Sequence, residues 1–163
     1  MGHQITALIG SRRALSRLIE QFGPPATVEL IEELVIMPLG NLRLDLLKEA
    51  PAPIHDGFAY LSSEVEAGIV AGVGAEPALY IETEYFGGMG AQGAALFADG
   101  KLMWRRAIST EDTGTILAKT PISQGLAALG VRSAVGQDEF DTAGLSRFRS
   151  LEELGLFEWE DED

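Results

Sequence analysis

The chain has 163 residues, of which 25 are Asp or Glu, 12 are Lys or Arg and none is Cys. This length suits one domain. The absence of cysteine excludes disulfide scaffolds, thiolate metal sites and cysteine nucleophiles. A formal net charge of −13 argues against binding to nucleic acid or to anionic membranes, because both require clustered Lys and Arg. No secretory signal is recognised, and no segment approaches the ~18 apolar residues of a membrane span, so we expect a cytoplasmic protein.

The first fifty residues are predicted to form a strand, a helix and a second strand. The apolar run Ile5 to Ile9 is typical of a strand, and Ser11 is the expected N-cap of a helix that ends near Gly23. The run Val28 to Met37 is rich in β-branched residues and predicts one strand, although its start also fits a helical turn. The leucines between residues 42 and 47 give no decided pattern.

A short strand and a helix are predicted next. Gly57 to Leu61 has the composition of a strand, and Ser63 with Glu66 has the spacing of a capping box at a helix start. Apolar residues at helical spacing continue to position 73. Gly68 and Gly72 lie inside this helix and weaken it by about 1 kcal/mol each relative to Ala.

The strongest strand signals lie in the middle of the chain. Residues 79–86 alternate and are rich in aromatic and β-branched side chains, which predicts a strand. Residues 94–98 and 101–105 flank Asp99-Gly100, a dipeptide typical of a two-residue hairpin because both central residues need positive φ. We therefore expect three consecutive strands here.

The last third of the chain is predicted to be mainly helical. Thr120 is an expected N-cap with Pro at the first helical position, and Ser150 with Glu153 repeats the capping-box spacing. Residues 158–163 are expected to be an acidic, solvated tail. Residues 1–157 are then one globular domain of the α/β or α+β class, with a mixed sheet, antiparallel strands at its centre and helices packed on it.

A glycine motif follows the central strand. Gly88, Gly90 and Gly93 fit the G-x-G-x-x-G pattern of dinucleotide sites, but such a site needs a helix to begin at the third glycine, and a hairpin follows here. No Lys or Arg lies between Lys48 and Lys101 to hold phosphate. We therefore predict no cofactor, and interpret the motif as a flexible connection between strands.

Two glutamates alternate on the central strand. Glu82 and Glu84 share one face of the predicted sheet, with Cα atoms ~7 Å apart. The pattern favours a solvent-facing surface, and the alternatives are a partner-binding face or a carboxylate pair for hydrolysis or for a metal. His3 and His55 have no metal-ligand spacing, although His55 and Asp56 could form a local pair. We predict no metal site and no catalytic residue.

The acidity is concentrated in two segments. Residues 51–100 contain seven acidic residues and no Lys or Arg, and residues 158–163 contain five more acidic residues. An acidic surface keeps a protein soluble, and it is also what a binder of a basic protein requires, because complementary charge speeds encounter and sets specificity. Both interpretations are retained.

The segment YIETEYFGGMGAQGAA, residues 80–95, together with FADG at 97–100, resembles a motif of small uncharacterised bacterial proteins. Some of these resemble immunity proteins of polymorphic toxin systems. The resemblance implies a cytoplasmic protein without catalysis of its own that binds and neutralises a cognate toxin. The motif positions that it marks for partner binding, with Asp56 added from the acidic segment, are Glu82, Glu84, Tyr85, Phe86, Gly87, Gly88, Gln92 and Asp56.

The sequence therefore predicts a non-catalytic acidic protein that binds a basic partner such as a toxin. One alternative is a small hydrolase or metal-dependent enzyme that uses Glu82 and Glu84. Another is a structural protein that assembles as a homo-oligomer.

Overall fold

The computed structural model describes residues 2–23, 27–31, 33–86, 89–109, 120–132 and 150–154. The described strands form one sheet in the order β2-β3-β1-β4-β5-β6. They are β1 (Gly2–Ser11), β2 (Val28–Glu29), β3 (Leu34–Pro38), β4 (Ala78–Phe86), β5 (Met89–Ala98) and β6 (Lys101–Ser109). The helices are α1 (Arg12–Phe22), α2 (Asn41–Leu47), α3 (Ser63–Val73) and α4 (Pro121–Ala128), and a 3₁₀ turn follows at η2 (Glu152–Leu154).

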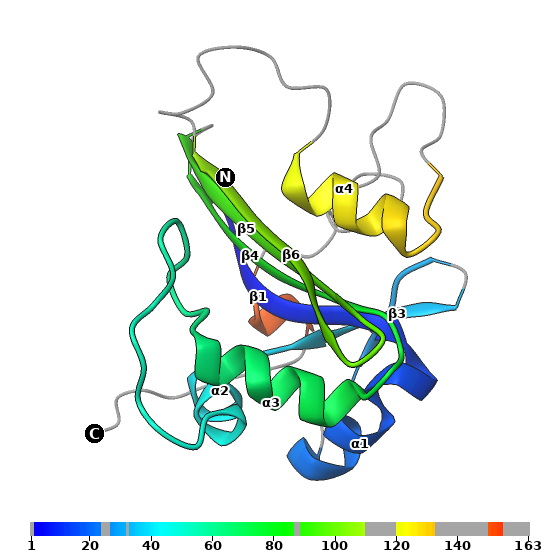
Figure 1. The fold of residues 1–163 in the computed structure, drawn as a ribbon. Coiled ribbons are helices and arrows are strands. Elements are labelled where there is room, and N and C mark those ends of the chain that lie inside the picture. Colours follow the sequence, from blue (N-terminus) through cyan, green and yellow to red (C-terminus); the bar gives the residue numbers. More distant parts are fainter. Residues whose placement is uncertain are drawn as a thin grey trace.

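Helices lie on both faces of the sheet, which confirms a single α+β fold (Figure 1). Every pairing between these strands is antiparallel, so the sheet is not the mixed one that we expected. Hairpins account for three of these five pairings, β2–β3, β4–β5 and β5–β6, because a hairpin can join only antiparallel strands.

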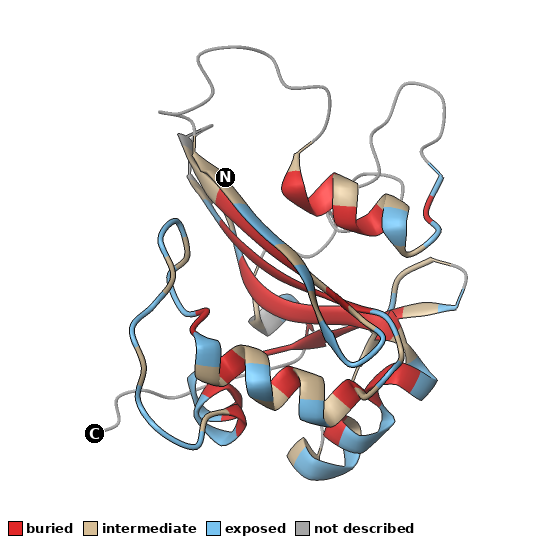
Figure 2. Ribbon diagram, viewed as in Figure 1, coloured by how far each residue is buried: buried red, intermediate tan, exposed pale blue. Residues whose placement is uncertain are grey.

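The sheet separates two hydrophobic clusters. Helices α1, α2 and α3 pack on one face and α4 packs on the other, and both inner surfaces are buried (Figure 2). Tyr80 of β4 belongs to the first cluster with Phe97, and the next residue, Ile81, belongs to the second with Ile122. This alternation is the ordinary period of a strand, and it also places Glu82 and Glu84 on the face covered by α1, α2 and α3.

The first strand and helix agree with the sequence prediction. The Ser11 hydroxyl accepts a hydrogen bond from the Ala14 backbone N–H at 3.0 Å, as expected of an N-cap. The helix ends at Gly23, which has a φ of 74° and whose N–H donates to the Ile19 carbonyl.

The single strand predicted over residues 28–37 is wrong, because a turn divides it into β2 and β3. The Leu30 N–H donates to the Leu34 carbonyl at 3.0 Å, and the Leu34 N–H donates to the Ile31 carbonyl at 2.9 Å. The turn leaves Glu33 exposed, whereas Val35 and the residues after it are buried.

The strand predicted at residues 57–61 is also wrong, since this segment is an irregular loop. Its backbone is closed by bonds from the His55 N–H to the Leu61 carbonyl, 2.8 Å, and from the Phe58 N–H to the His55 carbonyl, 3.1 Å. The N–H groups of residues 59–61 bind a side chain of β4 instead of a neighbouring strand. The helix that follows is capped by Ser62, one residue before the predicted cap, and its hydroxyl accepts from Val65.

The Asp99-Gly100 hairpin is confirmed, with φ values of 56° and 79° at the two residues. The flexible glycine connection is not, because β5 begins at Met89 and so contains Gly90 and Gly93. These two residues pair with Tyr85 and Glu82 of β4. The strand accepts the two glycines because the backbone or a ring packs closely against each of them.

The C-terminal predictions are tested only in part. The Thr120 hydroxyl caps α4 by accepting from the Ser123 N–H at 3.3 Å, which is the predicted cap. The Ser150 hydroxyl accepts from the Glu153 N–H at 3.4 Å, and the described part of this segment is the short turn η2. The tail at 158–163 and the domain limit at residue 157 lie outside the described residues.

The two glycines of α3 mark its contacts with other helices. A Cβ atom on Gly68 would overlap the carbonyl oxygen of Leu47 in α2. A Cβ atom on Gly72 would lie 2.6 Å from Cδ2 of Leu18 in α1. The glycines therefore allow three helices to pack closely on one face of the sheet, which offsets their low helix propensity.

Candidate binding cavity

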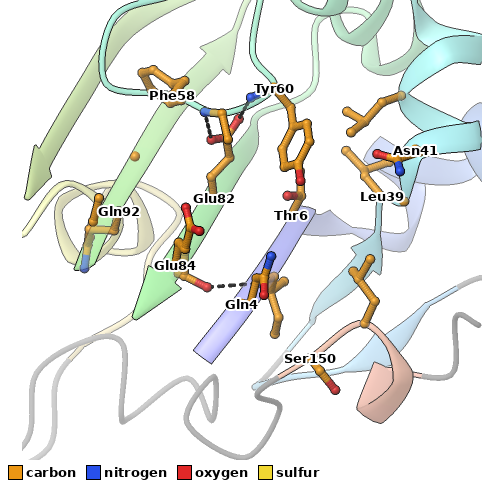
Figure 3. A pocket seen from close by; sticks show the side chains of 18 of the residues that line it. Gln4, Thr6, Leu39, Asn41, Phe58, Tyr60, Glu82, Glu84, Gln92 and Ser150 are labelled. Atoms are coloured by element: carbon orange, nitrogen blue, oxygen red, sulfur yellow. Dashed lines mark hydrogen bonds between the residues drawn. The ribbon is translucent and has the colours of Figure 1, made fainter. Parts of the chain in front are cut away.

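A cavity of about 450 Å³ lies on the face of the sheet that carries Glu82 and Glu84 (Figure 3). Strands β1, β4 and β5 form its floor, and the loop at residues 57–60 and the start of α2 form its walls. Its volume lies within the roughly 300–1,000 Å³ of small-ligand sites. The side chains labelled in Figure 3 are Gln4, Thr6, Leu39, Asn41, Phe58, Tyr60, Glu82, Glu84, Gln92 and Ser150.

Glycines at two contacts allow the loop at residues 57–60 to lie close to strands β5 and β6. A Cβ atom on Gly93 of β5 would lie 2.5 Å from Cε2 of Phe58, so the ring rests where a side chain would otherwise stand. Gly57 has a φ of 84°, and a Cβ atom there would lie 2.7 Å from that of Ala107 in β6. The glycines at both contacts thus set the height of the loop above the sheet.

Glu82 attaches the loop to β4. Its side chain is 7% exposed, which is contrary to the solvent-facing position expected from the sequence. Oε1 accepts from the Ala59 N–H at 2.7 Å, and Oε2 accepts from the N–H groups of Tyr60 and Leu61, both at 3.0 Å. The Tyr80 hydroxyl donates to Oε2 at 2.6 Å. The burial is tolerated because four donors replace the water that the carboxylate loses.

The Tyr80 hydroxyl is held in its protonated form. Burial, together with the negative charge of Glu82, raises the pKa of Tyr80 well above its ordinary value of 10.0. The hydroxyl therefore remains a donor to Glu82 throughout the neutral and mildly alkaline range.

Glu84 has a different environment although it lies only two residues away. It is exposed at the cavity wall. No hydrogen bond or ion pair joins its carboxylate to another residue in the part of the chain that the structure describes. Of the two glutamates, Glu84 is the one whose oxygens are accessible to a ligand.

Two other predicted site residues form a contact on the opposite face. The Gln92 amide oxygen accepts from the Ile122 N–H of α4 at 3.0 Å, and its nitrogen donates to the Tyr85 hydroxyl at 3.2 Å. Gln92 is 7% exposed, so these bonds join β5 to α4 within the protein. Gln92 borders the cavity, but its amide and Tyr85 are directed away from Glu82 and Glu84.

The remaining predicted residues are dispersed. Asp56 is exposed in the loop. Phe86 is the last residue of β4, and the structure describes its backbone only. Gly87 and Gly88 lie outside the described residues. The local pair of His55 with Asp56 is replaced by a contact with Glu66, whose Oε2 lies 3.3 Å from His55 Nε2.

The cavity is completed by aromatic and polar residues that were not predicted from the sequence. Phe58 and Tyr60 come from the loop that was interpreted as a strand, and Thr6 and Gln4 come from β1. The only sequence signal was a pair of aromatic side chains in a segment that follows two prolines. Their relation to Glu84 depends on which strand lies beside β4, and that is decided by the topology of the sheet.

Comparison of the chain with known proteins gave no match to a protein-family model, to a curated protein or to a solved structure. Among the described residues, no helix is long and apolar enough to cross a membrane. The same residues contain no group of three or more His, Asp or Glu side chains placed to hold a metal ion.

Proposed function

We propose that this chain is a non-catalytic, cytoplasmic binding protein that recognises a basic protein, such as a cognate bacterial toxin, at the cavity. The observation that carries the proposal is the charge of the cavity wall. Glu82 and Glu84 line it, and none of its described lining residues is Lys, Arg or His. A site of this kind attracts cationic groups and repels anionic ones.

The charge of Glu82 contributes although its oxygens are occupied. Its four donors are three backbone N–H groups and one hydroxyl, all of them neutral. They stabilise the carboxylate without cancelling its formal charge. The ion pairs found among the described residues neutralise other acids, such as Glu29, Glu66 and Glu76. The cavity therefore keeps a negative potential toward an approaching cation.

The same geometry favours binding over the alternative of hydrolysis by a glutamate pair. A general base or metal ligand needs accessible lone pairs, and the lone pairs of Glu82 already accept hydrogen bonds from the loop and from Tyr80. Bringing Glu82 into a reaction would release the loop that forms one wall of the cavity. Glu84 alone does not supply the second carboxylate of such a mechanism.

The proposal is tested with the purified protein as bait in a lysate of its source organism. We expect one captured protein of high isoelectric point, and the association rate of the purified pair should fall as salt is raised. Glu84→Lys should slow association by about tenfold or more, because a repelling charge replaces an attracting one at the site.

Glu33→Lys is the matched control, since Glu33 is exposed in the β2–β3 turn at the far end of β1 from the cavity. It makes the same change in net charge and should alter association much less. An equal effect of the two substitutions would show that net charge, rather than the cavity, governs binding. A mass measurement in solution that gave only a homo-oligomer, together with no captured partner, would favour the structural alternative.

A further inference from the structure

We infer that the cavity accepts a guanidinium group on an apolar stem, the chemistry of an arginine side chain. The inference rests on the proposed function and specifies the ligand group that the same site would hold. It is based on three properties of the cavity wall: oxygen acceptors, two aromatic rings and the absence of a cation among the described lining residues.

The acceptors suit a planar group with many donors. Besides the carboxylate of Glu84, the lining includes the Thr6 hydroxyl and the side-chain amide of Gln4. In Figure 3 Glu84 lies on β4, and Gln4 and Thr6 lie on the neighbouring strand β1. A guanidinium has five N–H donors in a fixed plane, whereas an ammonium has three donors at one point. Dispersed acceptors therefore favour the guanidinium.

The apolar part of the wall suits the stem and the face of that group. Phe58 and Tyr60 extend from the loop, Leu39 lies between β3 and α2, and Leu44 lies in α2. Tyr60 is 38% exposed, which is a large exposure for an aromatic residue at a cavity. A guanidinium stacks on an aromatic ring and is more weakly hydrated than an ammonium, so it loses less on leaving water.

The test uses the full chain and three blocked amino acids: N-acetyl-arginine methylamide, its lysine counterpart and its citrulline counterpart. Citrulline has the shape of arginine without the charge. Binding is followed by chemical shifts of the amides of Thr6, Tyr60 and Glu84. We expect the arginine compound to bind at least about tenfold more tightly than the citrulline compound, because a hydrogen bond between charged groups is stronger than one to a neutral group. The lysine compound should bind more weakly than the arginine compound.

Variants separate the contacts. Glu84→Gln should weaken arginine binding by about tenfold, while Glu33→Gln, outside the cavity, should leave it unchanged. Tyr60→Phe should preserve most of the affinity and Tyr60→Leu should not, since only the first keeps the ring. Agmatine, a free small molecule with the same group, distinguishes the source: tighter binding of the blocked arginine indicates a protein side chain, and tighter binding of agmatine indicates a small-molecule amine.

Equal binding of arginine, lysine and citrulline compounds, or no binding by any of them, would overturn the inference. These results are distinguishable from failure of the proposed function. If a basic protein is captured and is sensitive to Glu84→Lys while blocked arginine neither binds nor competes, the binding function stands and the arginine site does not. If blocked arginine binds as expected and no basic protein is captured, the arginine site stands and the proposed binding of a basic protein does not.

Discussion

Replacing Glu82 by Gln removes one acceptor from the junction between the loop and β4 with almost no change of shape. The carboxylate receives one bond at Oε1 and three at Oε2. An amide has a single acceptor oxygen, so its NH₂ group must face at least one backbone N–H. In the better orientation the oxygen keeps its three donors, and the N–H of Ala59 meets another donor.

The expected cost follows from that count. An unsatisfied buried N–H costs about 1–3 kcal/mol, and the bonds that remain weaken because they are no longer charge-assisted. We expect Glu82→Gln to lower the free energy of unfolding by about 2–4 kcal/mol. At about 2–4 °C per kcal/mol for a chain of this size, the Tm should fall by about 4–16 °C.

The assay is urea unfolding followed by circular dichroism, with hydrogen exchange at the amides of residues 59–61 as a local readout. Exchange there should be faster in the variant, most of all at Ala59, because that N–H loses its acceptor and the bonds of Tyr60 and Leu61 are no longer charge-assisted. Glu84→Gln is the matched control on the same strand and face, and as an exposed side chain it should change stability by less than about 0.5 kcal/mol. Equal stability of both variants and wild type, with unchanged exchange, would refute the assigned role of Glu82.

Three further substitutions test other parts of the fold. Tyr80→Phe should lower the free energy of unfolding by about 1–3 kcal/mol near pH 7. Because the folded-state pKa of Tyr80 is raised, the stability that its hydroxyl gives is complete below pH 10.0 and is lost as the pH rises toward the folded-state pKa. In urea titrations at increasing pH, the stability of the variant should therefore decline less than that of the wild type. Gly68→Ala should destabilise, because the overlap with the Leu47 carbonyl outweighs a gain in helix propensity of about 1 kcal/mol; thermal unfolding measures the sign. Gly93→Ala should cost about 1–3 kcal/mol by displacing the Phe58 ring, and a double-mutant cycle with Phe58→Leu should recover part of that loss.

Each of these predictions has a result that contradicts it. If the stabilities of wild type and Tyr80→Phe declined equally at alkaline pH, titration of Tyr80 would not contribute to the pH dependence of stability. A stabilised Gly68→Ala would mean that α2 and α3 are not in close contact at that point. Additive effects of Gly93→Ala and Phe58→Leu on stability would mean that the Phe58 ring does not pack against Gly93.

Several features that depend on neighbouring residues in the chain were predicted correctly, although the β2–β3 turn was missed and the cap of α3 was placed one residue late. The caps at Ser11 and Thr120, the helix end at Gly23 and the hairpin at Asp99-Gly100 are all confirmed. Each uses groups within a few residues of one another, so the sequence contains both partners of the interaction. The α+β class follows from the same local elements taken together.

Features that depend on partners far away in the sequence were not predicted correctly. The loop containing Phe58 has the composition of a strand, but its N–H groups find an acceptor on Glu82, about twenty residues later. The glycines at 90 and 93 resemble a flexible connection, but they lie in a strand beneath groups that leave no space for a side chain. Local pattern does not record which segment will cover a given residue.

The two glutamates illustrate the division most clearly. The sequence by itself determined that Glu82 and Glu84 lie on one face of one strand, because the side-chain period of a strand is fixed by its backbone. Only the tertiary structure decided that the loop covers Glu82 and leaves Glu84 in the cavity wall. The physical reason is that burial of a carboxylate requires several donors at once, and these come from residues that only the folded chain brings to β4.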